Sequence, residues 1–173
     1  NGALTHGYEG INYAANNGAD VINMSWGGGG FSNYGQNICN AAFNAGAILV
    51  AAAGNDGNSQ QFYPAAYNNV ISVASTTTTD AKSSFSQYGT WIDISAPGSA
   101  IRSTYANSTS SYARIQGTSM ASPNVAGLIG LMKSYVPTAS NQDIINCLLS
   151  SADNIDAANS NYLGQLGAGR INA

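Results

Sequence analysis

Charged side chains are scarce in this sequence. Its 173 residues include five Lys and Arg and eight Asp and Glu, which is 8% of the chain and gives a net charge of −3 at pH 7. A soluble domain usually carries about 25% charged residues. No basic run is present, which excludes nucleic acid and anionic membrane as expected partners. No apolar stretch reaches the roughly 18 residues of a membrane span. Polarity comes instead from Asn, Ser, Gly, Thr, Gln and Tyr, which favours an exported protein.

Cysteine and histidine are also rare. The chain has two cysteines, Cys39 and Cys147, and one histidine, His6. No CxxC pair or Cys/His cluster exists, which excludes the usual zinc patterns. The sequence leaves open whether the two cysteines bridge. Because each has apolar neighbours, we expect two buried free thiols rather than a disulfide.

Apolar periodicity divides the chain into alternating helices and strands. Helices are predicted over 4–17, 34–46, 119–135 and 141–152. Strands are predicted over 20–25, 47–53, 69–75 and 91–98, and a short extended segment over 112–116. Alternating strands and helices form βαβ units with right-handed crossovers. The sequence therefore predicts an α/β fold with three layers, in which helices flank a mainly parallel central sheet.

Three glycine-rich turns with small polar side chains follow predicted extended segments. They are "SWGGGG" at 25–30, "GNDGN" at 54–58 and "GTS" at 117–119. In parallel sheets, ligands bind beyond the carboxyl ends of the strands. These turns therefore predict an active-site edge.

Ser119 stands in the last of these turns, where a buried helix is predicted to begin. One reading is that Thr118 or Ser119 only caps the helix, and composition alone favours it. In the other reading, Ser119 is a nucleophile. The free N–H groups and the dipole of a helix N-terminus would stabilise its developing oxyanion.

The longer string "GTSMASPNVAG" (117–127) resembles the serine motif of the subtilisin-like serine proteases, the subtilases. "AAAGNDG" (51–57) resembles the oxyanion-hole segment of that family, and "INMSWGG" (22–28) resembles its substrate-binding strand. Two further blocks, "SSFSQYG" (83–89) and "DISAPG" (93–98), follow in the family's order. The resemblance covers essentially the whole chain. Asn124 departs from it, because the family usually has a histidine there, although that histidine is not part of the catalytic triad.

The resemblance implies a role for each matching position. Ser119 would be the acylated nucleophile, and Asn55 would donate a hydrogen bond to the oxyanion. The implied substrate-binding positions are Ser25, Trp26 and Gly27, which would pair with the substrate backbone, then Ala51, Ala52 and Gly54 as pocket walls, and Phe62, which would narrow the pocket floor.

The resemblance implies no cofactor for the chemistry, but it allows a structural calcium ion. An acidic residue matching Asp93 joins backbone carbonyls near residues 64–70 in related proteins. The alternative reading is that Asp93 is an ordinary loop residue near the start of a strand.

A subtilase triad also needs an aspartate in an Asp-Ser/Thr-Gly turn and a histidine in a His-Gly-Thr helix start. This sequence has neither. His6 precedes Gly7, but a later family block follows it and Ser119 is too close, so we interpret His6 as a helix-surface residue. We therefore expect residues 1–173 to be the C-terminal portion of a subtilisin-like peptidase domain. The base and its acid would lie on a missing N-terminal segment or a companion chain.

The expected function is that of a secreted serine endopeptidase, with this chain alone inactive or very weak. The expected partners are a polypeptide substrate, the N-terminal fragment of the same domain and a pro-peptide inhibitor. A noncatalytic subtilase-like fragment or an exported binding module is the alternative.

Overall fold

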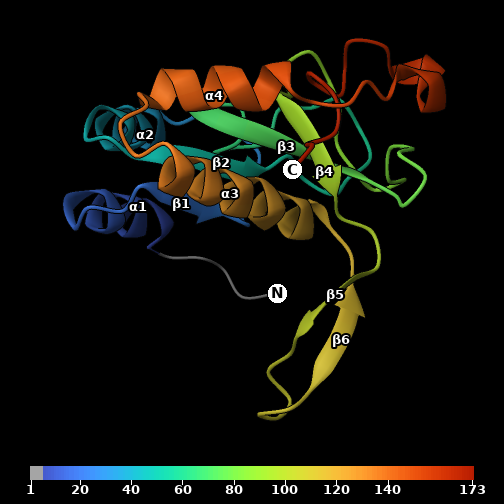
Figure 1. Cartoon of the computed structure of the whole chain (residues 1–173), viewed down its shortest axis with the longest axis horizontal. Coiled ribbons are helices and arrows are strands. Elements are labelled where there is room, and N and C mark those ends of the chain that lie inside the picture. The colour runs from blue at the N-terminus through green and yellow to red at the C-terminus, as the bar shows by residue number, and fades with distance from the viewer. Residues whose placement is uncertain (1–5) are drawn as a thin grey trace.

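A computed structural model describes residues 6–173, so the first part of the helix predicted over 4–17 lies outside the described residues (Figure 1). The central sheet has four parallel strands in the order β1-β2-β3-β4. They are β1 (Val21–Met24), β2 (Ile48–Ala52), β3 (Val70–Thr76) and β4 (Ile94–Pro97). This is the mainly parallel sheet that the sequence predicts.

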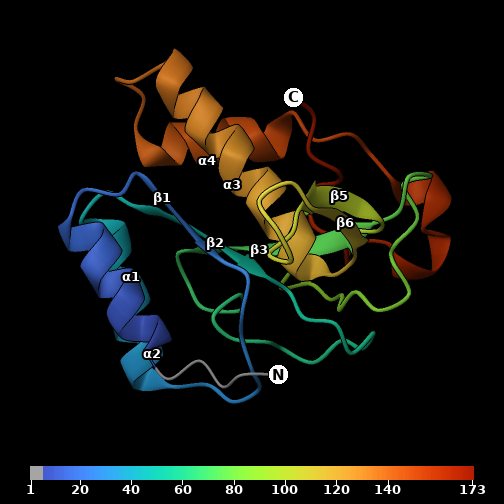
Figure 2. The same cartoon turned by 90° about the horizontal axis from the view of Figure 1, so that it is seen from below.

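Two pairs of helices cover the sheet, one pair on each face (Figure 2). The first pair is α1 (Gly7–Asn16) and α2 (Asn33–Asn44), and the second is α3 (Thr118–Tyr135) and α4 (Asn141–Ser150). Short 3-10 turns, η1 (Asp156–Ala158) and η2 (Ser160–Tyr162), follow. None of the helices within 6–173 is long and apolar enough to cross a membrane.

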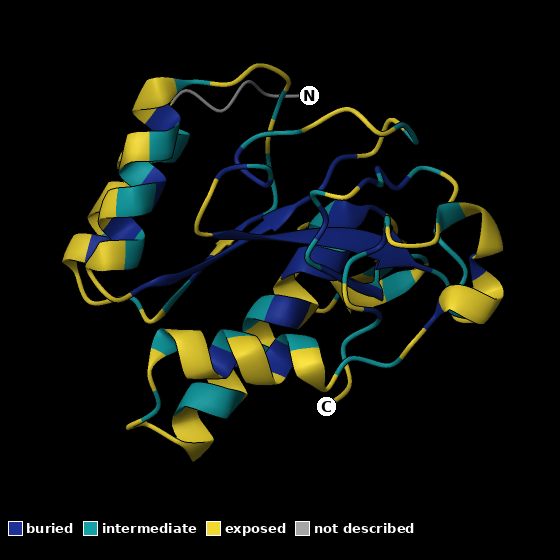
Figure 3. Ribbon diagram, turned by 90° about the horizontal axis from the view of Figure 1, so that it is seen from above, coloured by how far each residue is buried: buried dark blue, intermediate teal, exposed yellow. Residues whose placement is uncertain are grey.

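Strand β2 shows why the layers form. Leu49 and Ala51 pack against α1 and α2, whereas Ile48 and Val50 pack in the other core with α3 and α4. Every residue of β2 and β3 is buried, and these strands form the dark centre of Figure 3. A strand covered on both faces reads as a continuous apolar run. The three-layer prediction is confirmed.

A two-stranded antiparallel hairpin extends away from these layers (Figure 1). It consists of β5 (Ile101–Thr104) and β6 (Tyr112–Ile115). The sequence predicts only the second as extended, because β5 is polar and largely exposed and shows no apolar alternation. The strand predicted over 91–98 is also shorter than expected, since β4 begins at Ile94.

Both cysteines are free thiols, as expected, but only Cys39 is buried. The expectation that Cys147 is buried is wrong. Helix α4 directs Ile144 and Leu148 into the core, so Cys147 lies on its exposed side.

Candidate active site

The loops after β1 and β2 meet the N-terminus of α3 at the carboxyl edge of the sheet. Ser119 is partly exposed there, and its hydroxyl donates a hydrogen bond to the Ser25 carbonyl at 3.2 Å. The Ser25 hydroxyl in turn donates to the Ser119 carbonyl at 2.8 Å. The structure therefore brings two of the predicted turns into direct contact through the predicted nucleophile.

Pro123 explains why the Ser119 carbonyl is available to Ser25. In an α-helix this carbonyl would accept from the N–H of residue 123, which proline lacks. Because α3 begins at Thr118, Pro123 lies inside the helix, beyond the first turn in which it is most easily tolerated. The hydroxyl of Ser25 takes the place of the missing donor and joins the β1 loop to α3.

A second set of hydrogen bonds supports this junction from β1. The Ser122 hydroxyl donates to Asn23 Oδ1 at 2.7 Å, and Asn23 Nδ2 donates to the Ser25 hydroxyl at 2.9 Å. Ser25 is therefore held by the strand before it and by the first turns of α3. The position of Ser119 relative to the sheet depends on this network.

Thr118 orients the predicted oxyanion donor, Asn55. Asn55 Oδ1 accepts from the Thr118 backbone N–H at 2.8 Å and from the Thr118 hydroxyl at 3.0 Å. The same hydroxyl accepts from the Gly54 backbone N–H at 3.1 Å. With its oxygen engaged in this way, the Asn55 amide has its Nδ2 group left to donate.

The interpretation of Thr118 or Ser119 as a helix cap is wrong. The N-cap of α3 is Gly117, and no side chain of the cap residue bonds the helix. Asn55, from the β2 loop, instead satisfies the first backbone N–H of α3. The next N–H along, that of Ser119, belongs to the first turn, whose N–H groups have no partner within the helix. The Ser119 N–H and the Asn55 Nδ2 group therefore remain the two predicted oxyanion donors.

Phe62 lies against both loops that the resemblance assigns to substrate binding. A Cβ atom added to Gly27 would overlap the Phe62 ring, and one added to Gly54 would lie 3.1 Å from Phe62 Cγ. Gly54 also has φ of 110°, and a Cβ there would collide with the Gln87 amide oxygen. Both glycines are therefore required where they stand, because Phe62 and Gln87 fill the space beside them.

At three other predicted substrate-binding positions, Trp26, Ala51 and Ala52, the side chain packs inside the protein. The Trp26 ring packs edge-to-face on Tyr8 at 5.6 Å, so its side chain belongs to the core on the α1 side. Ala51 and Ala52 are 0% and 1% exposed inside β2, and their side chains face no open surface. Among these residues, the structure packs Gly27 and Gly54 against Phe62, and it joins Ser25 to Ser119 by hydrogen bonds.

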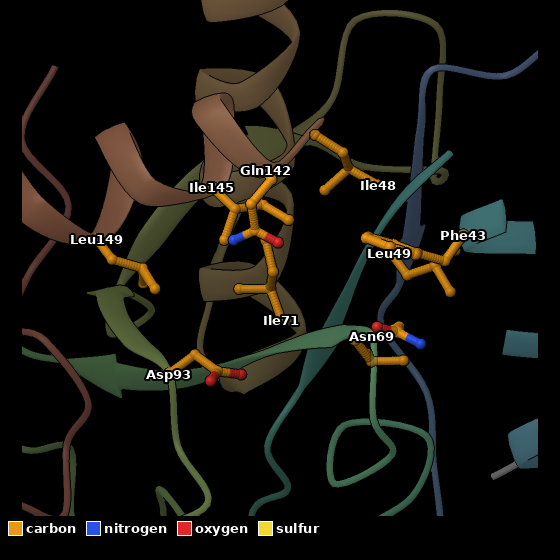
Figure 4. Close-up of a pocket in the computed structure, with 10 residues that line it drawn as sticks. Phe43, Ile48, Leu49, Asn69, Ile71, Asp93, Gln142, Ile145 and Leu149 are labelled. Atoms are coloured by element: carbon orange, nitrogen blue, oxygen red, sulfur yellow. The ribbon is translucent and has the colours of Figure 1, made fainter. Parts of the chain in front are cut away.

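Asp93 is partly buried and accepts two hydrogen bonds from Ser72 through Oδ2, from the backbone N–H at 2.8 Å and from the hydroxyl at 2.7 Å. Burial raises the pKa of its carboxyl group above the ordinary value, and the bonds from Ser72 oppose that rise. Figure 4 shows Asp93 at a cavity of about 180 Å³, which Asn69 and Gln142 also line. Residues 6–173 contain no group of three or more His, Cys, Asp or Glu side chains that could hold a metal.

A second, polar cavity of about 350 Å³ also reaches Asp93, and residues 65–70 line it. Backbone carbonyls and one carboxylate are hard oxygen donors, which suit Ca²⁺ and not Zn²⁺. Asp93 and residues 65–70 thus line one polar cavity, and the calcium site that the resemblance allows stays a prediction.

His6 is exposed and forms the N-cap of α1 without a side-chain cap bond, which confirms that it is a helix-surface residue. Among the described residues, the Ser119 hydroxyl bonds only to Ser25. The sequence did not predict that Thr118 orients Asn55 or that Pro123 leaves the Ser119 carbonyl free for Ser25. Their signals are present, since Thr118 directly precedes the candidate nucleophile and Pro123 is four residues after it.

A partly exposed serine hydroxyl in the first turn of a helix, at the carboxyl edge of a parallel sheet, is an arrangement found in serine hydrolases built on α/β folds. The chain belongs to the Subtilase family, whose match covers residues 1–169.

Individual relatives agree with this assignment. The chain is 47% identical over 172 residues to thermitase of Thermoactinomyces vulgaris and 41% identical to subtilisin BL of Lederbergia lenta. Each alignment covers 99% of this chain, but 59% of thermitase and 61% of subtilisin BL. Among solved structures, a protease of Pseudoalteromonas arctica matches with a TM-score of 0.88 and 35% identity, covering 99% of this chain and 57% of that protein. The chain thus spans about three fifths of these relatives.

Proposed function

We propose that this chain is the nucleophile-bearing part of a secreted serine endopeptidase. The observation that carries the proposal is the pair of hydrogen bonds by which Thr118, the residue before Ser119, orients the Asn55 amide. The family and the names of the relatives support it, since they include thermitase, subtilisins and an "Extracellular protease" of Xanthomonas campestris. The low charge content supports secretion.

The proposed reaction is acyl transfer. Ser119 Oγ attacks the substrate carbonyl carbon while its proton passes to a histidine. That histidine and its aspartate belong to a segment outside these 173 residues. The N–H of Ser119 and Asn55 Nδ2 donate to the oxyanion. The intermediate then expels the amine, which takes the proton from the histidine, and water hydrolyses the acyl-enzyme. Before attack, the Ser119 hydroxyl must leave its 3.2 Å bond to the Ser25 carbonyl.

The substrate would bind as an extended strand along Ser25–Gly27, with its acyl side chain beside Gly54 and Phe62. Since the Phe62 ring lies against both glycines, a small side chain is preferred. Phe62→Ala should shift kcat/KM toward large acyl side chains by about 10- to 100-fold. An unchanged ratio between alanine and phenylalanine substrates would remove Phe62 from the pocket.

A fluorophosphonate probe tests the nucleophile directly. We expect Ser119 to be phosphonylated when the chain is combined with the segment that carries the base, and only weakly in the chain alone. Ser119→Ala should abolish labelling, whereas Ser134→Ala, which removes an exposed hydroxyl elsewhere on α3, keeps a hydroxyl at 119 and serves as the matched control. If Ser119 stays unlabelled in the combined protein, the chain is a noncatalytic binding module. A pro-peptide inhibitor would protect Ser119 from the same probe.

We also propose that a calcium ion binds between Asp93 and the backbone carbonyls of residues 65–70, where it would stabilise this loop without taking part in the chemistry. Calcium should raise the melting temperature of the wild-type chain. Asp93→Asn should lose that response, and Asp143→Asn, a carboxylate on α4, should keep it. A response equal in all three proteins would contradict the site.

A further inference from the structure

The basic residues of this chain fall into two groups. Three of the five have partners in the structure, and these are Lys82, Lys133 and Arg170. Backbone carbonyls bind the first, and aspartates bind the other two. Within residues 6–173, Arg102 and Arg114 form no ion pair. Among residues 6–173, the two basic side chains with neither an ion pair nor a hydrogen bond thus both lie on the hairpin, in a chain of net charge −3.

The two arginines lie directly opposite each other across the hairpin, one on β5 and one on β6. Paired residues of antiparallel strands point to the same face, and like charges in that position are destabilising. Both residues are exposed. The Arg102 guanidinium lies over the Tyr112 ring at 5.2 Å, which limits its freedom. The hairpin therefore presents a double positive charge that an anion between the arginines would stabilise.

This face is close to the nucleophile along the chain. Arg114 is five residues before Ser119, so their Cα atoms are at most about 18 Å apart. The base of the hairpin is fixed beside the site, because the Gly117 N–H donates to the Gly98 carbonyl at 2.9 Å. The hairpin follows β4, and Ser25 follows β1. Because β1 and β4 are the two edge strands of the sheet, the chain leaves the sheet toward the hairpin at one edge and toward Ser25 at the other.

We propose that Arg102 and Arg114 bind acidic side chains of the polypeptide substrate on the leaving-group side of the scissile bond. This inference rests on the proposed function, because it needs a substrate whose acyl half lies along Ser25–Gly27 and whose carbonyl carbon is at Ser119. The leaving-group half then continues toward the hairpin. Two guanidinium groups on one face match one or two carboxylates, with which arginine forms bidentate hydrogen bonds.

The test uses paired internally quenched peptides that differ only in Glu or Gln at the second to fourth positions after the cleaved bond. The enzyme is the chain combined with the segment that carries the base. Wild type should favour the Glu peptides in kcat/KM by about 3- to 10-fold at low salt, the range of a few exposed ion pairs. The preference should fall toward unity in 1 M salt, where the screening length is about 3 Å.

Arg102→Gln combined with Arg114→Gln should abolish the preference and leave hydrolysis of the Gln peptides unchanged. Lys133→Gln, which removes a positive charge on α3, is the control and should keep the preference. A charge reversal, Arg102→Glu with Arg114→Glu, should favour Lys in place of Glu. Melting temperatures of all variants show whether the hairpin remains folded.

Three outcomes would overturn the proposal. They are an unchanged Glu preference in the double Gln variant, no preference in wild type, and a double variant that loses association with the base-carrying segment instead of the preference. If wild type labels with the fluorophosphonate but shows no preference, only this inference fails. If wild type does not label, the proposed function fails first. Binding of a fluorescent acidic peptide to the Ser119→Ala variant then tests the two arginines without catalysis. The peptide should still bind, and its binding should be lost when Arg102 and Arg114 are also replaced by Gln.

Discussion

Strands β2 and β3 differ from the β5–β6 hairpin in burial and in polarity. The first two are buried on both faces between helix pairs, and apolar residues make up all of β2 and most of β3. Most hairpin residues are exposed, and the hairpin carries unpaired arginines. The Asn55 side chain, in the loop after β2, is hydrogen-bonded to Thr118, the residue before Ser119, whereas the hairpin exposes two arginines. Hydrogen-bonded polar groups near Ser119 and exposed charge farther away thus come from different elements.

The largest expected difference between the two regions is in amide hydrogen exchange. Backbone amides in β2 and β3 should open only with global unfolding, while the hairpin should open locally. We expect protection factors to differ by at least about a thousandfold, because several kcal/mol separate these two kinds of opening. Mass spectrometry of peptides from the two regions measures this difference in protection. Equal protection would show that the hairpin is part of the core.

Removing the oxyanion donor should have the next largest effect. Asn55→Ala, in the combined protein, should lower kcat by about 10²–10³, the loss typical of removing such a donor in this family, with KM little changed. Asp56→Ala, a control substitution in the same loop, should keep kcat within about twofold of the wild-type value, because surface substitutions usually have small effects. A kcat for Asn55→Ala near that of wild type would show that the oxyanion binds elsewhere.

Gly54 tests the rigidity of the β2 loop through stability. Gly54→Ala should lower the free energy of unfolding by about 2–4 kcal/mol, because a Cβ there is strained at φ of 110° and collides with Gln87. Gly130→Ala on α3 is the matched control. It meets no atom within 4 Å and should raise stability by about 0.5–1 kcal/mol. Urea denaturation measures both, and a neutral Gly54→Ala would contradict the packing described here.

The smallest expected effect is the difference in reactivity between the two cysteine thiols. Burial raises the pKa of Cys39 to about 12, so at pH 8 it is almost entirely the unreactive thiol. A thiol reagent at pH 8 should therefore modify one group per folded chain, Cys147, and both groups in urea. Cys147→Ser should leave the folded chain unmodified. Rapid modification of Cys39 in that variant would show that the α2 side of the core opens.

The sequence predicts the layers well because the signals are local. The apolar run of β2 and the turns that follow β1 and β2 predict the sheet and the edge where Ser119 lies. The hairpin strand β5 was not predicted, since Arg102, Ser103 and Thr104 are polar on both faces. The contacts of Asn55 with Thr118 join residues 63 positions apart, and no periodicity shows such a pair. Cys147 was misplaced because apolar neighbours in sequence lie on other faces of a helix.

In the proposed reaction, Ser119 and Asn55 act on one acyl adduct, Ser119 through its hydroxyl oxygen and Asn55 through its amide. The most direct measurement is a crystal structure of the chain, combined with the segment that carries the base, after reaction with a peptide boronic acid. We expect a bond between boron and Ser119 Oγ, with one boronate oxygen about 2.7–3.1 Å from both Asn55 Nδ2 and the Ser119 nitrogen. A boronate bound to another residue, or an oxygen directed away from Asn55, would contradict it.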